Sequence, residues 1–494
     1  KQAMSLKKQA TKGSMWISIT RTGMNVIDFA VYAYLARILT LEEFGLVGFC
    51  FLFIEFANTL VNAGVNQNLV QRKTWDDGYA ASTMTFVFGM GLVVAACLIF
   101  IGAPIAHYSY SVVAAYVVAS LAPITIIMSL QVVVTGKLLR EFKNKQMGTA
   151  KFIATVFSGI LIIMLAETGY GLWSLVIGKL VNAVLEFGLL TYVSKFKPKF
   201  HFDREDNREL ISFCLPLLWM TIMTFFHRKA SNMFTGLVLG PASFALLAAA
   251  KKGELVINQI TMSSINSMVV PSFSRAKDSA NIGDLYIKMV AITATLVLPI
   301  FMGLAAIADP FVVVAFGDKF APSAIYMTIS AFTMYPAVVA WFLPNLLISR
   351  AKTQEAFKLS LINVISNILV AGATIWFGVT VMLTALVINN FLILPLRFRI
   401  VARHIDINIK KLIKSLIPPF TCALGLFLCV TISKYYLENY ISNDVAMLAT
   451  LIVIGGVSYP VLAFSMFYKN TLNQLIELKE MFLKKRVTNT PKAK

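Results

Sequence analysis

The chain has 494 residues, of which 58% are hydrophobic and 14% charged, and its formal net charge is +20. Its mean hydropathy is +0.74. A soluble protein of this length has no way to bury so much apolar surface, so the composition excludes one. The positive charge does not indicate nucleic-acid binding, because no base-stacking module accompanies it.

The predicted elements are fourteen membrane-spanning helices, each built on an apolar stretch long enough for one bilayer crossing. In chain order they cover 14–38, 42–66, 79–101, 111–134, 147–167, 170–193, 209–238, 241–270, 284–307, 322–348, 355–376, 378–400, 412–434 and 443–467. The chain is basic and polar up to Gly13, and the segment that follows is too long and too charged for a cleavable signal peptide. The sequence therefore predicts an all-α polytopic membrane protein.

Lysine and arginine concentrate on alternate connections between these spans. The N-terminal segment, the even-numbered connections and the C-terminal segment hold 35 of the 44 bases, whereas the odd-numbered connections hold three. Because bases favour the cytoplasmic side of a membrane, this split predicts an even number of spans with both termini cytoplasmic.

An internal repeat indicates two matched lobes. The stretch "ILTLEEFGLVGF" at 38–49 resembles "VLGPASFALLAA" at 238–249, which aligns Phe44 with Phe244. Six spans precede the second copy, so the two copies share one orientation, as in parallel transporter repeats. We expect two six-helix lobes followed by two further helices. The expected domains are an N-terminal lobe at 1–194, a cytoplasmic linker at 195–208, a C-terminal lobe at 209–404, and the last two spans with a basic cytoplasmic tail at 405–494.

Ten charged residues lie deep inside the predicted spans, where an ionisable group costs at least ~2.5 kcal/mol. The bases are Arg21, Lys179, Arg228, Lys229, Lys251 and Lys252, and the acids are Asp28, Glu55, Glu186 and Glu254. One interpretation is that they line a water-filled cavity whose excess of bases suits an anionic cargo. The other is that they form internal salt bridges, such as Lys179 with Glu186 or Lys251 with Glu254.

Under the first interpretation the bases bind the substrate. Arg21, Arg228 and Lys251 are the foremost candidates, and Lys179, Lys252 and Lys229 are further ones. Arg228 is favoured over its neighbour Lys229, because a planar guanidinium suits a phosphate. Asp28 and Glu55 are candidates for coupling transport to a proton or sodium gradient.

Motifs of enzymes and motors are absent from the sequence. It contains no GxxxxGK[ST], no HExxH and no GxSxG. The predicted outer loops are too short to hold a catalytic domain. The sequence therefore predicts a protein that is not an enzyme and that has neither a cofactor nor a metal site.

The first predicted hairpin resembles that of a known family. The segment "ARILTLEEFGLVGFCFLFIEFANTLVNAGVNQNLVQRK" at 36–73 is similar to the start of Wzx-like polysaccharide transporters, which belong to the multidrug/oligosaccharidyl-lipid/polysaccharide superfamily. The similarity lies in Ala36-Arg37, in the turn Glu43-Phe44-Gly45, and in Val70-Gln71-Arg72. The subgroup that looks most similar exports colanic-acid-like or teichuronic-acid-like exopolysaccharides.

The resemblance implies a flippase of the bacterial inner membrane that moves undecaprenyl-pyrophosphate-linked oligosaccharides by alternating access. It also implies that basic residues of a central cavity contact the pyrophosphate, and that the polysaccharide polymerase machinery is a candidate partner. The alternatives are a multidrug or cation antiporter of the same superfamily, a lipid II flippase, and a membrane-embedded glycosyltransferase or polymerase. An antiporter of cationic drugs should have an acidic cavity, whereas here bases outnumber acids.

Overall fold

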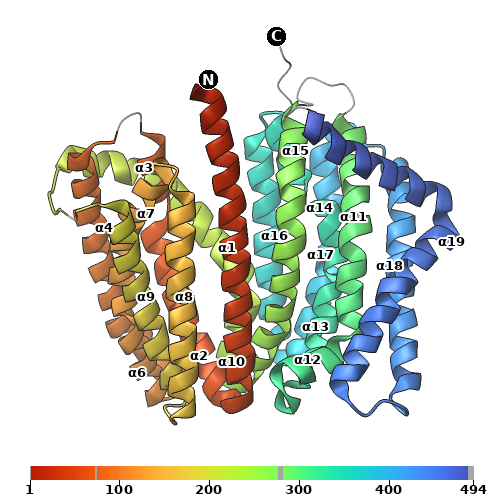
Figure 1. Cartoon of the computed structure of the whole chain (residues 1–494), viewed down its shortest axis with the longest axis horizontal. Coiled ribbons are helices and arrows are strands. Elements are labelled where there is room, and N and C mark those ends of the chain that lie inside the picture. The colour runs from red at the N-terminus through yellow and green to blue at the C-terminus, as the bar shows by residue number, and fades with distance from the viewer. Residues whose placement is uncertain (1, 73–74, 198, 276–281, 488–494) are drawn as a thin grey trace. The chain divides into compact units, whose positions relative to one another are not determined.

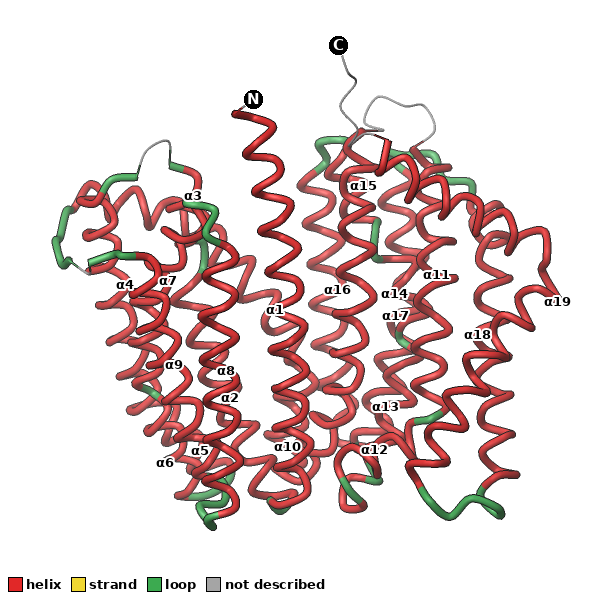
Figure 2. Tube along the Cα trace, viewed as in Figure 1, coloured by secondary structure: helices red, strands yellow, loops and turns green. Residues whose placement is uncertain are grey.

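The computed structural model describes residues 2–72, 75–197, 199–275 and 282–487, and every regular element within these ranges is a helix (Figure 1; Figure 2). The prediction of an all-α protein is therefore confirmed.

Twelve helical stretches in the described part of the chain are long and apolar enough to cross a membrane. One of them, Arg204–Gln259, holds two predicted spans, because helix α10 (Arg204–Arg275) loses its helical geometry at Gly240. Helix α1 (Gln2–Ile38), which carries several charged residues, is long enough but is not among the twelve. With α1 and with α10 counted as two helices, these ranges hold the fourteen helices that the sequence predicts.

The chain forms two compact units, Lys1–Ala248 and Ala249–Lys494. The helices of the first unit that precede α10 are α1, α2 (Leu41–Asn62), α3 (Val65–Gln71), α4 (Asp77–Cys97), a π-helical turn (Leu98–Gly102), α5 (Ala103–Ser109), α6 (Val112–Leu121), α7 (Pro123–Arg140), α8 (Asn144–Glu167) and α9 (Trp173–Ser194). The lobe and linker boundaries that the sequence suggests, at 194 and 209, stay a prediction.

Within its described residues, the second unit contains the end of α10 and nine further α-helices. They are α11 (Ile282–Ala306), α12 (Ala308–Phe316), α13 (Ser323–Phe332), α14 (Met334–Ala340), α15 (Leu343–Ser349), α16 (Thr353–Thr374), α17 (Val379–Ala402), α18 (Ile409–Leu437) and α19 (Asp444–Val487), with 3₁₀ turns at Asp318–Phe320 and Ile375–Phe377. Helices α18 and α19 run side by side (Figure 1).

Small residues let α1, α8 and α9 pack closely in the first unit, as is common where membrane helices cross. A Cβ atom on Gly148 of α8 would lie 2.6 Å from the Thr20 hydroxyl of α1, and one on Gly178 of α9 would lie 2.0 Å from the Ile162 side chain. Larger residues at these two positions would push the helices apart.

The two segments of the predicted repeat contact each other within the first unit. The backbone of Gly45 approaches that of Pro241 so closely that a Cβ atom on Gly45 would lie 1.8 Å from the Pro241 carbonyl oxygen. The Phe244 ring lies edge-on to Phe49, with 6.0 Å between the ring centroids. Glycine at position 45 is therefore required by this close approach.

The linker between α9 and α10 is packed against the first unit. The Phe196 ring is buried and meets the Trp75 ring edge-on at 6.2 Å, while Lys137 Nζ lies 5.3 Å from the Phe196 ring centroid. The backbone N–H of His201 donates to the Thr85 hydroxyl at 2.9 Å. These contacts tie the described part of the linker to α4 and α7.

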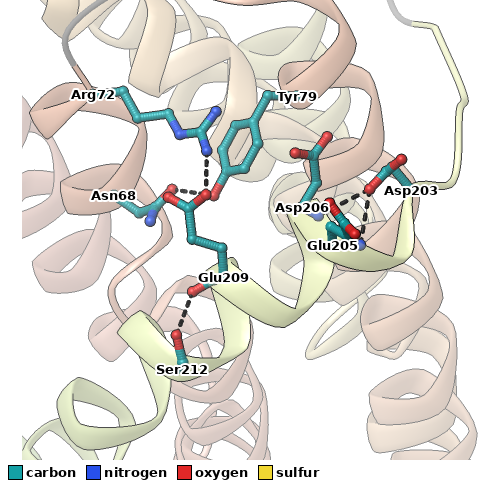
Figure 3. Close-up of polar contacts among 8 residues, drawn as sticks. All are labelled: Asn68, Arg72, Tyr79, Asp203, Glu205, Asp206, Glu209 and Ser212. Atoms are coloured by element: carbon teal, nitrogen blue, oxygen red, sulfur yellow. Dashed lines mark hydrogen bonds and ion pairs between the residues drawn. The ribbon is translucent and has the colours of Figure 1, made fainter.

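Polar contacts then fix the start of α10 (Figure 3). The Asp203 carboxylate accepts the Glu205 backbone N–H at 2.8 Å, which caps the helix. One turn further on, Glu209 forms an ion pair with Arg72 at 2.5 Å, and the Arg72 guanidinium lies 3.2 Å from the Tyr79 ring centroid. The first half of α10 is thus anchored to α3 and α4.

Burial differs strongly among the helices of the second unit. Its core forms around α11, where 72% of the most apolar 18-residue stretch is buried. Tyr286 of α11 donates its hydroxyl proton to the Val339 carbonyl at 2.7 Å. In α16 and α17 only 17% of the most apolar 18-residue stretch of each helix is buried. These two helices therefore leave most of their surface open to the surrounding medium.

Candidate functional site

The candidate site residues of α1 lie to one side of the face that contacts α8. Trp16 and Thr20 face α8, since Trp16 Nε1 donates to the Thr149 hydroxyl at 3.3 Å and Thr20 lies against Gly148. Arg21 is one residue on from Thr20, about 100° around the helix. Asp28 shares the face of Arg21, yet neither residue forms an ion pair with a described residue. Arg21 is exposed and Asp28 is half-buried.

Glu55 of α2 and Lys229 of α10 form an ion pair, with 2.7 Å between carboxylate oxygen and Nζ. Their side chains are 48% and 29% exposed, so the pair is reachable from outside the protein. Phe56 packs next to the pair against Phe225 and Phe226, with ring centroids 5.2 and 5.7 Å apart. Glu55 is thus neutralised within the first unit by a base that the sequence suggests for the substrate.

Arg228 precedes Lys229 on α10 but points elsewhere, as adjacent residues of a helix do. It is exposed, and it pairs with none of the described acids. The charge of Lys229 is compensated by Glu55, whereas that of Arg228 is not, and the preference for Arg228 as an anion ligand stays a prediction.

Glu186 of α9 pairs with a different lysine from the one that its spacing suggests. Its carboxylate lies 2.8 Å from Lys151 Nζ of α8, and the Gln131 amide of α7 donates to the same oxygen. Lys179, seven residues earlier on α9, is exposed and forms no ion pair with a described residue. Of the two interpretations, the internal Lys179–Glu186 salt bridge is therefore wrong.

Lys251, Lys252 and Glu254 follow the break of α10 and belong to the second unit. All three are half-buried. Gly253 between them lies against α12 and α13, since a Cβ atom there would come within 2.8 Å of the Met327 side chain. Glu254 lies within electrostatic reach of Lys251 and beside Ser330.

Two further polar residues have a role that the sequence alone did not suggest. Lys151, which holds Glu186, and Arg397 of α17 appear in sequence as loop bases, although both fall inside predicted spans. Their position within apolar stretches is the signal that could have identified them. No group of three or more His, Cys, Asp or Glu residues suited to a metal ion occurs in the described ranges.

Taken together, Arg21, Lys179 and Arg228 present unpaired charge on the first unit, which can attract an anion. Glu55–Lys229 and Glu186–Lys151 are internally neutralised. Asp28 is an unpaired acid of the same unit, so among the unpaired deep charges of the described residues the bases outnumber the acids.

Comparison with known proteins gives a consistent family. The family model described as "Polysaccharide biosynthesis protein" matches residues 34–325, more than half of the chain. The chain is 24% identical over 318 residues to "Succinoglycan biosynthesis transport protein ExoT" of Rhizobium meliloti (strain 1021), covering 64% of each protein. It is 22% identical over 329 residues to "Lipopolysaccharide biosynthesis protein WzxC" of Escherichia coli (strain K12), covering 64% of this chain and 65% of that one.

A third relative is "Teichuronic acid biosynthesis protein TuaB" of Bacillus subtilis (strain 168), with 23% identity over 331 residues, covering 64% of this chain and 66% of that protein. The matched part of the chain thus spans slightly less than two thirds of each of these three relatives.

Two solved structures share the fold. "Lipid II flippase MurJ, inward closed conformation" aligns with a TM-score of 0.76 and 15% identity over 93% of this chain and 100% of that one. An inward-facing "multidrug resistance MATE family transporter of the MOP superfamily" aligns with a TM-score of 0.54 and 15% identity over 77% and 95%. At these identities the likeness concerns the fold alone.

The matched family, the relatives and the spanning helices confirm the resemblance of the first hairpin to polysaccharide transporters. They also agree with a multi-pass location in the inner membrane. The chain belongs to the polysaccharide biosynthesis protein family, is similar in sequence to WzxC, and shares its fold with the MurJ flippase.

Proposed function

We propose that the protein is a flippase that translocates undecaprenyl-pyrophosphate-linked oligosaccharides across the inner membrane by alternating access. One observation carries the proposal: Arg21, Lys179 and Arg228 lie within spanning helices, are exposed, and pair with no described acid. Charge in a membrane is costly unless it is compensated. A pyrophosphate supplies the missing negative charge, and it has oxygens for the two N–H groups of an arginine fork.

The relatives support the class of cargo. Their names refer to the transport or biosynthesis of succinoglycan, lipopolysaccharide and teichuronic acid, which all are or contain polysaccharides. We therefore assign a lipid-linked saccharide of this kind to the chain, with the polyprenyl tail remaining in the bilayer while the head group crosses. The chain would act as a transporter and not as an enzyme.

In this proposal the residues have different roles. Arg21 and Arg228 bind the pyrophosphate, and Lys179, Lys251 and Lys252 add positive potential along the path. The Glu55–Lys229 pair serves coupling, because a proton or Na⁺ on the Glu55 carboxylate would weaken its hold on Lys229 and release one more base toward the cargo. Asp28, on the same face of α1 as Arg21, is a second coupling candidate.

Complementation tests the proposal. In a strain whose own polysaccharide transporter is deleted, the wild-type chain should restore polymer, whereas Arg21→Ala and Arg228→Ala should lower polymer at least ~10-fold, the effect of losing one charge-assisted contact. The matched control is Arg208→Ala, an exposed arginine near the start of the same helix as Arg228. Full polymer from both arginine variants at normal expression would overturn the cationic site.

The same cells separate the proposal from its rivals. A cation antiporter predicts resistance to cationic drugs that depends on Asp28 or Glu55 and not on Arg21. A lipid II flippase predicts rescue of cell-wall synthesis instead of exopolysaccharide. A membrane-embedded glycosyltransferase or polymerase predicts incorporation of sugar by the purified chain.

A further inference from the structure

A row of amide side chains joins α16 and α17 inside the second unit. The Ser366 hydroxyl donates to Asn389 Oδ1 at 2.8 Å, and the Asn389 amide donates to Asn367 Oδ1 at 3.0 Å. The Asn367 amide donates in turn to Asn363 Oδ1 at 3.2 Å. The row ends at this oxygen, which also accepts a hydrogen bond from the Arg397 guanidinium.

Arg397 is the charged end of this row and is almost fully buried. Only 9% of the residue is exposed, and it shares the buried face of α17 with Ile393 and Val401. Its Nε–H is buried without a hydrogen-bond partner, and no described acid forms an ion pair with it. Amides offer dipoles but no negative charge, so the positive charge of Arg397 is hydrogen-bonded but not neutralised. Such a charge is costly in a dry interior unless an anion accompanies it.

The surroundings identify the kind of anion. Arg397 lies five residues before the end of α17, roughly 7.5 Å in, at the end that the loop charges assign to the cytoplasm. Exposed bases gather where this end meets the start of α16: Lys352, Lys358, Arg399, Arg403 and His404. Glu355, the acid at the start of α16, is already paired with Lys358 at 2.8 Å.

The local potential is therefore positive at the depth of lipid head groups, next to two helices that leave most of their surface open. Basic pockets between spanning helices on the cytoplasmic side are suited to lipid phosphates. A guanidinium also matches phosphate oxygens better than a lysine does.

We propose that Arg397 and Asn363 form a binding site for the phosphate of an anionic membrane lipid between the cytoplasmic ends of α16 and α17. A phosphate oxygen takes the free hydrogen-bonding capacity of the guanidinium, and the exposed bases around it hold the rest of the head group. Because only 9% of Arg397 is exposed, its guanidinium contacts one or two of the phosphate oxygens. The site is independent of the proposed transport function, because a structural phospholipid and a polyprenyl phosphate both offer this phosphate.

Native mass spectrometry of the purified full-length chain in detergent tests the site. Three lipids are added separately: phosphatidylglycerol, a diacylglycerol without phosphate, and undecaprenyl phosphate. The wild type should retain phosphate-bearing lipid and little diacylglycerol. Arg397→Gln should lower this retention about tenfold, whereas the control Lys414→Gln, which removes an exposed charge from α18 outside the site, should lower it less than about twofold.

A second variant keeps the test valid if Arg397→Gln fails to fold. Asn363→Asp places a carboxylate on the atom that already accepts the Arg397 hydrogen bond, so it supplies the missing charge internally. Asn363→Asp should therefore lower lipid retention about tenfold. Its melting temperature in lipid-free detergent should equal or exceed that of the wild type. Stronger retention of phosphatidylglycerol points to a structural phospholipid, and stronger retention of undecaprenyl phosphate points to the cargo lipid. Equal retention of phosphate lipids by wild type, Arg397→Gln and Asn363→Asp would overturn the proposal.

Discussion

The helix pairs α8–α9 and α16–α17 each hold a cation between two helices, and they hold it in different ways. In α8–α9, Lys151 faces the Glu186 carboxylate at 2.8 Å, and Gln131 donates to the same oxygen. In α16–α17, Arg397 faces the side-chain oxygen of Asn363. The first cation is neutralised by its own chain, whereas the second is only solvated by amides.

This difference shows that hydrogen bonding and charge neutralisation are separate requirements inside a membrane. A neutralised pair is self-sufficient, and removing one partner strands the other. A solvated cation needs an anion from elsewhere, so its stability depends on the lipid that surrounds it. The two helix pairs should therefore respond in opposite ways to mutation and to lipid.

The largest effect should come from breaking the neutralised pair. Glu186→Leu leaves the half-buried Lys151 without its anion and should destabilise the protein by about 2 kcal/mol. Lys179→Leu on the same helix is the control, since Lys179 is exposed and has no ion-pair partner among the described residues. Thermal unfolding in detergent measures both variants. If the two melt alike, the Lys151–Glu186 pair does not hold α8 and α9 together.

A smaller effect is expected at the Glu55–Lys229 pair. Its two charges neutralise each other, as those of Lys151 and Glu186 do, but its side chains are more exposed. A double-mutant cycle with Glu55→Gln and Lys229→Gln should give a coupling of about 1 kcal/mol. Unlike Lys151–Glu186, this pair should also affect transport, because Glu55→Gln frees Lys229 beside Arg228. Polymer export in the complemented strain measures the effect of Glu55→Gln on transport. Wild-type export by Glu55→Gln would argue against a coupling role for this carboxylate.

The smallest effect should come from Arg72–Glu209, the pair that anchors the start of α10 outside the apolar region (Figure 3). Its side chains are 26% and 56% exposed, so we expect a coupling of about 0.5 kcal/mol at low salt. Raising the salt concentration to 1 M should weaken this coupling to about half or less, because the Debye length falls to about 3 Å. The Lys151–Glu186 coupling should change little over the same range. Equal salt sensitivity of the two pairs would contradict the difference in environment.

Much of the architecture follows from the sequence. Apolar stretches of bilayer length predict the fourteen helices, and the repeat predicts that Phe44 and Phe244 occupy equivalent positions. Both phenylalanines are buried, and the two segments that carry them are in contact through Gly45 and Pro241. The family resemblance of the first hairpin rests on residues of the same turn.

The candidate site is predicted less completely. Sequence identifies Arg21 and Arg228 as charges at membrane depth, and the structure leaves both exposed and without an ion pair. It does not identify Lys151 or Arg397, because their neighbours in sequence are also basic and make them look like loop residues.

The sequence by itself determined which residues enter the membrane and which of them share a face of one helix, since hydropathy and the helical period are properties of a single segment. Only the tertiary structure decided which charges are neutralised. Lys179 and Glu186 lie seven residues apart on one face of α9, yet Glu186 pairs with Lys151 of α8 and Arg397 meets an asparagine of α16. Partners across helices depend on which faces pack together, and a single helix does not determine this: the approach of α9 to α8 at Gly178 and Ile162 exists only in the folded bundle.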